Sequence, residues 1–315
     1  MAENGNLNEG RKEVKLLKPK YDIVFQSLFS NKNKKETGYL ISAILGTKVK
    51  IIKITTEISA VRELPEEKVE RLDLVAETEE GEIIHIELQL VDYKNTVKRL
   101  IYDLSQNMSK QLIRGKDYST IKRTVTIGLL NYNLEEINEK EPMHSVYQWR
   151  EKNRNELLTE VEELHIIEMS KAKRDYEKNP KDEIAQWALF ILNPNNKEVK
   201  SIMEENEEIN ETVEKLKTIS EDENIRKQAE ILERWEREEK WNKQSIFDYG
   251  KEQGVSERRR KWYKKRKIRN SKKYAKRKYT IRCYWKSYRF IKKSNWRNSI
   301  KNKKIVSLFL LFFLL

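Results

Sequence analysis

The sequence has little cysteine, glycine or proline, and it lacks an apolar run long enough to cross a membrane. Its 315 residues include one cysteine, Cys283, nine glycines and five prolines. A single cysteine excludes an intramolecular disulfide and a cysteine-based zinc cluster. Residues 305–315 are apolar apart from one serine, but a membrane-spanning helix needs about 20 such residues. No charged-then-apolar leader opens the chain, so we expect a cytoplasmic protein without stable membrane association.

Charged residues are abundant, at 37% of the sequence, but the two signs are unevenly distributed. Residues 256–315 hold 23 of the 65 lysines and arginines and a single acid, Glu257. The rest of the chain carries 42 basic and 50 acidic residues. The net charge of +14 therefore belongs to the tail, and a basic structural RNA-binding protein, one of the function classes that the charge suggests, would depend on the tail alone.

Residues 71–90 contain two arms that each alternate apolar and polar side chains, which is typical of half-buried strands. A three-residue loop with Gly81 in the left-handed conformation would set Asp73 directly opposite Glu87. Because side chains alternate between the faces of a strand, two more polar residues share the face of these acids: His85 and Gln89.

Asp73 and Glu87 would then face each other at about 5 Å between Cβ atoms, a spacing at which like charges are destabilising. A hard divalent cation would compensate, because Mg²⁺ is typically held by one or two carboxylates with waters and substrate phosphate. The alternative is that these are polar residues on a solvated sheet face.

Periodicity and end signals predict the elements around this hairpin. Strands are predicted at 49–58, 124–130 and 164–167, with a connection containing His144 to Trp149. Helices are predicted at 21–45 with a break near Asn31, at 92–114, at 170–192, at 196–219, and after Ser220 and Glu223, whose spacing suits a capping box. In the helix at 92–114 the predicted inward stripe is Val97, Ile101, Leu104, Met108 and Leu112.

This pattern predicts a mixed sheet with flanking helices, followed by an all-helical extension. We expect four parts: a loose lead-in at 1–17, a core at 18–169, a helical extension at 170–254 and a basic tail at 255–315. The three histidines lack metal-ligand spacing and are expected to be structural.

The element order, with an Asp on one strand and Glu-x-Gln on the next, resembles the α/β restriction-endonuclease-like PD-(D/E)XK phosphodiesterase fold. More narrowly, four stretches are similar to the Rpn family of recombination-promoting nucleases, also called PD-(D/E)XK nuclease family transposases: residues 19–29, 71–76, 85–89 and 163–168. The similarity covers residues 15–254.

The resemblance implies a metal-dependent DNA endonuclease that hydrolyses phosphodiester bonds in recombination, transposition or another mobile-element setting. It implies that Asp73 and Glu87 ligate Mg²⁺, with the Leu88 carbonyl as an extra ligand, and that Gln89 takes the position of the Lys found in the broader fold. Gln cannot act as a general base or carry positive charge. Lys94 or Lys98 on the next helix would supply that charge.

Two further residues are accessory candidates, each with a structural alternative. Asp22 would add a carboxylate or cap its helix, and Tyr102 would contact phosphate or be a half-buried structural tyrosine. A homodimer is expected only because two DNA strands must be cut. The competing interpretation is a catalytically degenerate DNA-binding or interaction protein on a nuclease scaffold.

The tail after Gly254 shows neither a 2.0- nor a 3.6-residue apolar period. One interpretation is a basic, aromatic-interleaved nucleic-acid arm. The other is a frameshift near Val255, because back-translating residues 256–293 with AT-rich codons and dropping one base gives a Gly-, Lys- and Glu-rich helical sequence. That hidden sequence resembles the C-terminus common in the Rpn family. A frameshifted tail would be poorly ordered.

Overall fold

The computed structural model describes residues 15–58, 72–92, 94–112, 117–252, 266–267 and 269–270. The described strands are β1 (Ile51–Ile58), β2 (Leu72–Thr78), β3 (Ile83–Gln89), β4 (Thr124–Leu130), β5 (His144–Arg150) and β6 (Leu157–Glu168). The described α-helices are α1 (Asp22–Leu28), α2 (Lys34–Leu45), α3 (Thr96–Gln111), α4 (Ala172–Lys178), α5 (Glu183–Leu192), α6 (Lys197–Glu205), α7 (Glu207–Glu221) and α8 (Glu223–Glu252).

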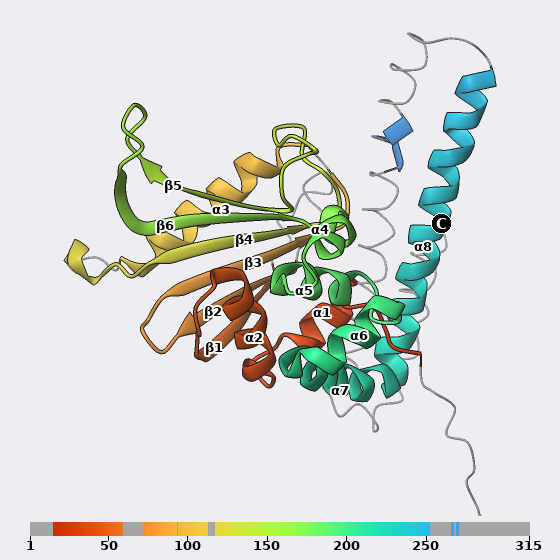
Figure 1. Cartoon of the computed structure of the whole chain (residues 1–315), viewed down its shortest axis with the longest axis horizontal. Helices are drawn as coiled ribbons and strands as arrows, with labels where there is room; N and C mark the ends of the chain where they lie inside the picture. The colour runs from red at the N-terminus through yellow and green to blue at the C-terminus, as the bar shows by residue number, and fades with distance from the viewer. Residues whose placement is uncertain are drawn as a thin grey trace, which may run out of the picture. The chain divides into compact units, whose positions relative to one another are not determined.

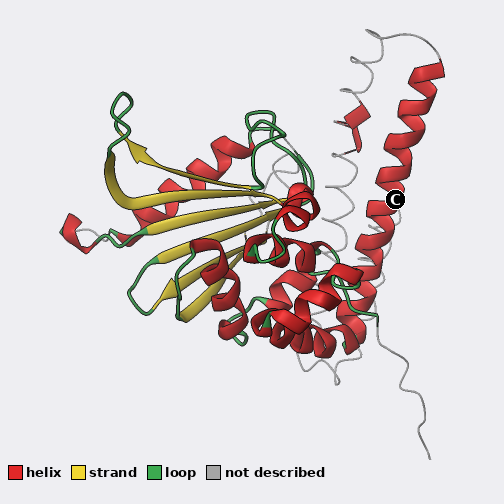
Figure 2. Cartoon of the chain, viewed as in Figure 1, coloured by secondary structure: helices red, strands yellow, loops and turns green. Residues whose placement is uncertain are grey.

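The six described strands form one mixed sheet in the order β1-β2-β3-β4-β6-β5, which is labelled in Figure 1 and drawn in yellow in Figure 2. Antiparallel pairing joins β1, β2 and β3, parallel pairing joins β3, β4 and β6, and β5 pairs antiparallel with β6. The parallel step from β3 to β4 is made by a crossover through α3, as parallel pairing requires. The predicted fold class, a mixed sheet with flanking helices, is confirmed.

The hairpin between β2 and β3 has the predicted register. Gly81 has a φ of +82°, a conformation that costs glycine little. The Thr78 N–H donates to the Glu82 carbonyl at 3.0 Å, and the pairing beyond the loop sets Asp73 opposite Glu87.

The two faces of the sheet pack into different cores. Leu74, Ile84 and Ile86 are fully buried in a large core with α1, α2, α5, α6 and α7. On the other face, Leu100 and Leu104 of α3 pack against β4 and β6 in a second, smaller core. In Figure 1, α3 runs behind the sheet while α1, α2 and α5 lie on the near side. The polar residues of the hairpin therefore lie under α3.

Several predicted helix boundaries are wrong. Asp22 is the first residue of α1 and Tyr21 stands at the N-cap, so the capping role predicted for Asp22 is wrong. The break near Asn31 is confirmed, because α1 and α2 are separate helices. The helices predicted at 170–192 and 196–219 are each divided in two, and Asp222, rather than Ser220, accepts hydrogen bonds from the first turn of α8.

The inward face of α3 also differs from the prediction. Ile101 is 49% exposed, whereas Leu100 and Leu104 are buried, so the stripe is rotated by about one residue from the predicted one. Polar residues were excluded from the predicted stripe, yet two are buried in it: Thr96 and Asn107.

A strand was missed at the edge of the sheet. His144 to Trp149, predicted as a connection, lies within β5, and β6 begins seven residues before the predicted strand. β5 has the mixed exposure of an edge strand, with Tyr147 and Trp149 about half exposed, which hides the usual alternation.

Contacts divide the chain into two compact units. The first, Met1–Ala60 with Glu70–Lys240, contains the sheet, α1 to α7 and the first part of α8. The second, Val61–Val69 with Trp241–Leu315, contains the end of α8. The four sequence-derived parts stay a prediction, and the tail at 255–315, for which a frameshift and poor order are predicted, lies almost wholly outside the described residues. No helix in the described part of the chain is long and apolar enough to cross a membrane.

Candidate active site

The polar face of the β2–β3 hairpin is buried. The side chains of Glu87 and His85 are 0% and 2% exposed, and that of Asp73 is 14% exposed. Ionisable groups at this depth are costly unless they are paired or bind an ion. The alternative of a solvated sheet face is therefore wrong.

Close packing of α3 on β4 brings this helix to the hairpin. Gly128 stands beside Glu87 in the parallel pairing of β3 and β4. A Cβ atom at Gly128 would lie 2.8 Å from Leu100 Cδ1, so only glycine leaves room for Leu100 at this position. The residue before Leu100 in α3 is Arg99, which is thereby brought against Glu87.

Glu87 forms an ion pair with Arg99. Its Oε1 lies 2.7 Å from Arg99 Nη2, and the Arg99 side chain is only 14% exposed. Arg99 Nε and Nη2 are nevertheless buried without a well-directed hydrogen bond to any described residue. The guanidinium thus neutralises Glu87 and keeps donors for a further acceptor.

Asp73 is next to a histidine. Its Oδ2 lies 3.5 Å from His85 Nε2, while its Oδ1 is buried without a hydrogen-bond donor among the described residues. Burial by itself lowers the pKa of His85, but Asp73, Asp103 and Glu87 together raise the net pKa above the ordinary histidine value. The site without a metal ion therefore favours the imidazolium, a second cation among its acids.

Gln89 is held by two hydroxyl groups. The Tyr132 hydroxyl donates to Gln89 Oε1 at 2.7 Å and lies 2.7 Å from the Thr96 hydroxyl, which is itself 3.4 Å from the same oxygen. Gln89 Nε2 is buried and has no acceptor among the described residues. The amide oxygen of Gln89 therefore has its hydrogen bonds, and the amide nitrogen can donate to a phosphate or to a water.

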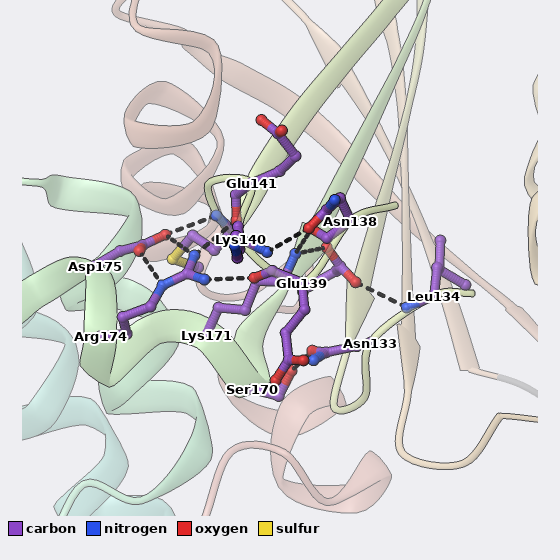
Figure 3. A network of polar contacts seen from close by, with 12 residues as sticks. Asn133, Leu134, Asn138, Glu139, Lys140, Glu141, Ser170, Lys171, Arg174 and Asp175 are labelled. Carbon is purple, nitrogen blue, oxygen red and sulfur yellow. Dashed lines mark hydrogen bonds and ion pairs between the residues drawn. The ribbon is translucent and has the colours of Figure 1, made fainter. Parts of the chain in front are cut away.

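The loop that carries Tyr132 is fixed by the network in Figure 3. The Leu134 N–H donates to Glu168 Oε1 at 2.8 Å, and Glu168 is also paired with Lys171. Further along the loop, the Met143 N–H donates to Asp175 at 2.7 Å. The remaining contacts of the network tie Ser170 to Asn133, Lys171 to the Asn138 carbonyl and Arg174 to the carbonyls of Glu139 and Glu141.

Charge stabilises this network. Burial raises the pKa of Asp175, but the Arg174 guanidinium and the Met143 N–H lower it by more than burial raises it. The net pKa is therefore below the ordinary aspartate value. Asp175 thus stays ionised and holds the end of the loop. The position of Tyr132 at the site follows from contacts made by β6 and α4.

The other two histidines lie outside the site. His144 Nε2 is 2.8 Å from His165 Nδ1, and His165 Nε2 is 2.5 Å from Glu163 Oε1. Burial, with the neighbouring His165, lowers the pKa of His144 to about 4. A neutral, hydrogen-bonded pair agrees with the structural role predicted for these residues.

The acids of the site have the chemistry that a divalent cation needs. Within the described part of the chain, no group of three or more His, Cys, Asp or Glu side chains is arranged to hold a metal ion. A Mg²⁺ site needs only one or two carboxylates, and the orphaned Oδ1 of Asp73 is an acceptor that such an ion would satisfy. Asp73 and Glu87 thus fit a divalent ion, and Arg99 and His85 are the cations it must compete with.

The accessory candidates lie on two different elements: Lys98 and Tyr102 on α3, with Lys94 just before it, and Asp22 on α1. Lys94 pairs with Glu135 at 3.0 Å, which engages its charge, and Tyr102 is 62% exposed on α3, so the half-buried structural alternative for it is wrong. Lys98 is exposed on the same helix. Asp22 begins α1, which packs in the core on the other face of the sheet. Their roles stay predictions.

Sequence reasoning missed Arg99, Thr96 and Tyr132. Arg99 and Thr96 lie three residues apart on α3, outside the predicted apolar stripe, so the periodicity that predicted this helix offered no signal for either residue. Tyr132 offered none, because its position depends on a loop held by side chains that follow about forty residues later in the chain.

An antiparallel hairpin with opposed acids, a crossover helix and a parallel strand beside it together define a PD-(D/E)XK nuclease-like protein. Within that class, the chain belongs to the PD-(D/E)XK nuclease family transposases, whose family model matches residues 19–247. No curated protein and no solved structure matches the chain. The family predicted from the sequence is confirmed, and with it a nuclease or transposase type of function in general terms.

Proposed function

We propose that this protein is a Mg²⁺-dependent DNA endonuclease that hydrolyses phosphodiester bonds in recombination or transposition. The observation that carries the proposal is the buried pair of acids, Asp73 opposite Glu87, next to unfilled donors on Arg99 and Gln89. Acids suit a metal ion, and the donors suit the phosphate that the ion would share.

Each residue has a distinct part in this proposal. Asp73 and Glu87 would hold the ion, with the Leu88 carbonyl as a further ligand. A bound divalent ion would supply a Lewis acid that lowers the pKa of water and offsets negative charge on the phosphate. Gln89, oriented by Tyr132, would donate from Nε2 and position the attacking water or the phosphate. Lys98 and Tyr102, exposed on α3, would contact the DNA backbone.

Nicking of supercoiled plasmid DNA tests this function. The parent protein should nick in Mg²⁺ and stop when the metal is chelated, and Asp73→Asn should abolish nicking because it removes a ligand charge without changing shape. Glu77→Gln is the matched control, since Glu77 lies on the same strand and face, opposite Ile83 and away from Glu87. Nicking by Asp73→Asn at the parental rate would contradict the proposal.

The second candidate is a DNA-binding protein on a degenerate nuclease scaffold. It is favoured by one observation: both acids already have cationic neighbours, Arg99 and His85, and Gln89 stands where a lysine would. DNA binding that survives Asp73→Asn, with no cleavage by the parent, would support this candidate. Cytoplasmic action and a homodimer that cuts both strands are further parts of the first proposal.

A further inference from the structure

Arg99 is an arginine side chain that contacts a proposed metal ligand directly. It reaches Glu87 from α3 at 2.7 Å and is mostly buried with it. Leu100, packed on Gly128, fixes the helix at this distance. The packing of α3 on the sheet therefore fixes the position of Arg99 in the site.

The ion pair has a function in the protein without a metal. A carboxylate with no exposed surface is unstable unless a cation accompanies it. Arg99 supplies that charge, and because its pKa is far above neutrality it cannot be switched off by losing a proton. Arg99 is thus the resident counter-ion of Glu87.

A divalent ion at Asp73 and Glu87 would change this balance. It would take over the neutralisation of Glu87 and repel the nearby guanidinium. Arg99 Nε and Nη2, which have no directed hydrogen bond among the described residues, would then need an acceptor. A DNA phosphate is the acceptor that suits the planar donor fork of arginine best, and Gln89 Nε2 offers a third donor beside it.

We propose that Arg99 exchanges acceptors, pairing with Glu87 in the metal-free protein and with a DNA phosphate when a divalent ion is bound. The inference rests on the proposed function, since it takes Asp73 and Glu87 as the ligands. Its consequence is that metal and DNA each strengthen the binding of the other. The ion alone must bind against the positive charge of Arg99, whereas DNA draws that charge away from Glu87.

Binding measurements on the full chain test this without any need for cleavage. Ca²⁺, a hard cation with the same preference for oxygen ligands, is titrated by calorimetry with and without a short mixed-sequence DNA duplex. We expect DNA to tighten Ca²⁺ binding by about tenfold or more, and Ca²⁺ to tighten DNA binding by the same factor, because coupling between two sites is reciprocal.

Variants identify Arg99 as the origin of the coupling. Arg99→Gln should bind Ca²⁺ more tightly than the parent in the absence of DNA, and DNA should then add little. Lys110→Gln, which removes one charge from the far end of α3, should keep the parental coupling factor. If Arg99→Gln fails to fold, Arg99→Lys retains the charge but not the fork, and its coupling factor should fall between those of the parent and unity.

The possible results separate this inference from the function beneath it. Ca²⁺ binding that requires Asp73 but is unaffected by DNA would overturn the exchange of acceptors and leave the metal site intact. A loss of thermal stability in Arg99→Gln with an unchanged coupling factor would overturn it as well, since Arg99 would then be only structural. Absence of Ca²⁺ binding with and without DNA would overturn the metal-dependent function itself.

Discussion

At the scale of single residues, each buried acid of the site lies beside a side chain of opposite charge. Asp73 has His85 beside it, Glu87 has Arg99, and Gln89 has Tyr132. Each acid therefore has a cation in the metal-free protein, which explains how two buried carboxylates can face each other across a hairpin. The unfilled atoms, Asp73 Oδ1 and Gln89 Nε2 among them, are the places where a metal ion and a substrate would complete the set.

The Tyr132 hydroxyl should control the orientation of Gln89. In Tyr132→Phe the Gln89 amide loses its main hydrogen bond and can turn its oxygen toward the acids. We expect the cleavage rate kcat to fall about tenfold, the equivalent of about 1.4 kcal/mol, because a donor aimed at the reacting phosphate is lost part of the time. The measurement is nicking at saturating DNA, together with Ca²⁺ affinity, which should not change.

Tyr147→Phe is the control for this change, since Tyr147 lies half exposed on β5. If the variant at Tyr132 loses Ca²⁺ binding and thermal stability in proportion to its rate, the hydroxyl has a structural role and the assignment is wrong.

At the scale of elements, β6 and α4 hold the loop after β4 in place. Glu168 ends β6 with its side chain 1% exposed, and Lys171, 3% exposed, pairs with it. The same carboxylate accepts the Leu134 N–H at 2.8 Å. A buried ion pair of this kind fixes one geometry, so β6 sets the position of a loop whose second residue contacts the site.

Breaking this pair on one side should be costly. Lys171→Met leaves Glu168 buried without its cation, and we expect the free energy of unfolding to fall by about 3 kcal/mol. Glu168→Gln together with Lys171→Met removes both charges and should recover a large part of the loss, since an amide oxygen can still accept the Leu134 N–H. Urea denaturation of the parent, the single variant and the double variant measures these free energies of unfolding.

Lys173→Met provides the comparison, because Lys173 is 63% exposed and its substitution should change stability by no more than about 0.5 kcal/mol. Equal effects at Lys171 and Lys173 would show that the Glu168 pair contributes nothing particular to the loop.

At the scale of the whole molecule, the region that matches the family model and the tail after it differ in charge: the chain before residue 256 is acidic overall, and the tail is strongly basic. The family match covers residues 19–247 and stops before the tail, where the basic residues concentrate. The proposed metal ligands, the crossover helix and the loop that carries Tyr132 all lie within the matched region. The proposed function therefore depends on the first unit and does not require the tail.

The hypothesis of a frameshift near Val255 can be tested on the gene. The coding DNA, read one base out of frame beyond that point, should stay open and encode the Gly-, Lys- and Glu-rich sequence that continues the family pattern. Nucleotide sequencing of the coding region is the measurement. Stop codons early in the shifted frame would refute the frameshift and leave the nucleic-acid arm as the explanation. In that case, removal of residues 256–315 should abolish DNA affinity and its steep dependence on salt.

Local sequence was enough to predict the hairpin and the two acids that face each other on it. Period-two alternation and Gly81 act between near neighbours in the chain, so the register that pairs Asp73 with Glu87 followed from local rules. The edge strand β5 did not follow, because its half-exposed side chains obscure the period.

The groups that contact those acids depend on packing between distant parts of the chain. Arg99 reaches Glu87 because Leu100 packs on a glycine in a strand that lies beyond the helix in the chain, and Tyr132 reaches Gln89 because β6 and α4 fix its loop. Both depend on packing between distant segments, which leaves no periodic trace in the sequence. Local backbone rules placed the ligands, and long-range packing supplied the groups that neutralise and orient them.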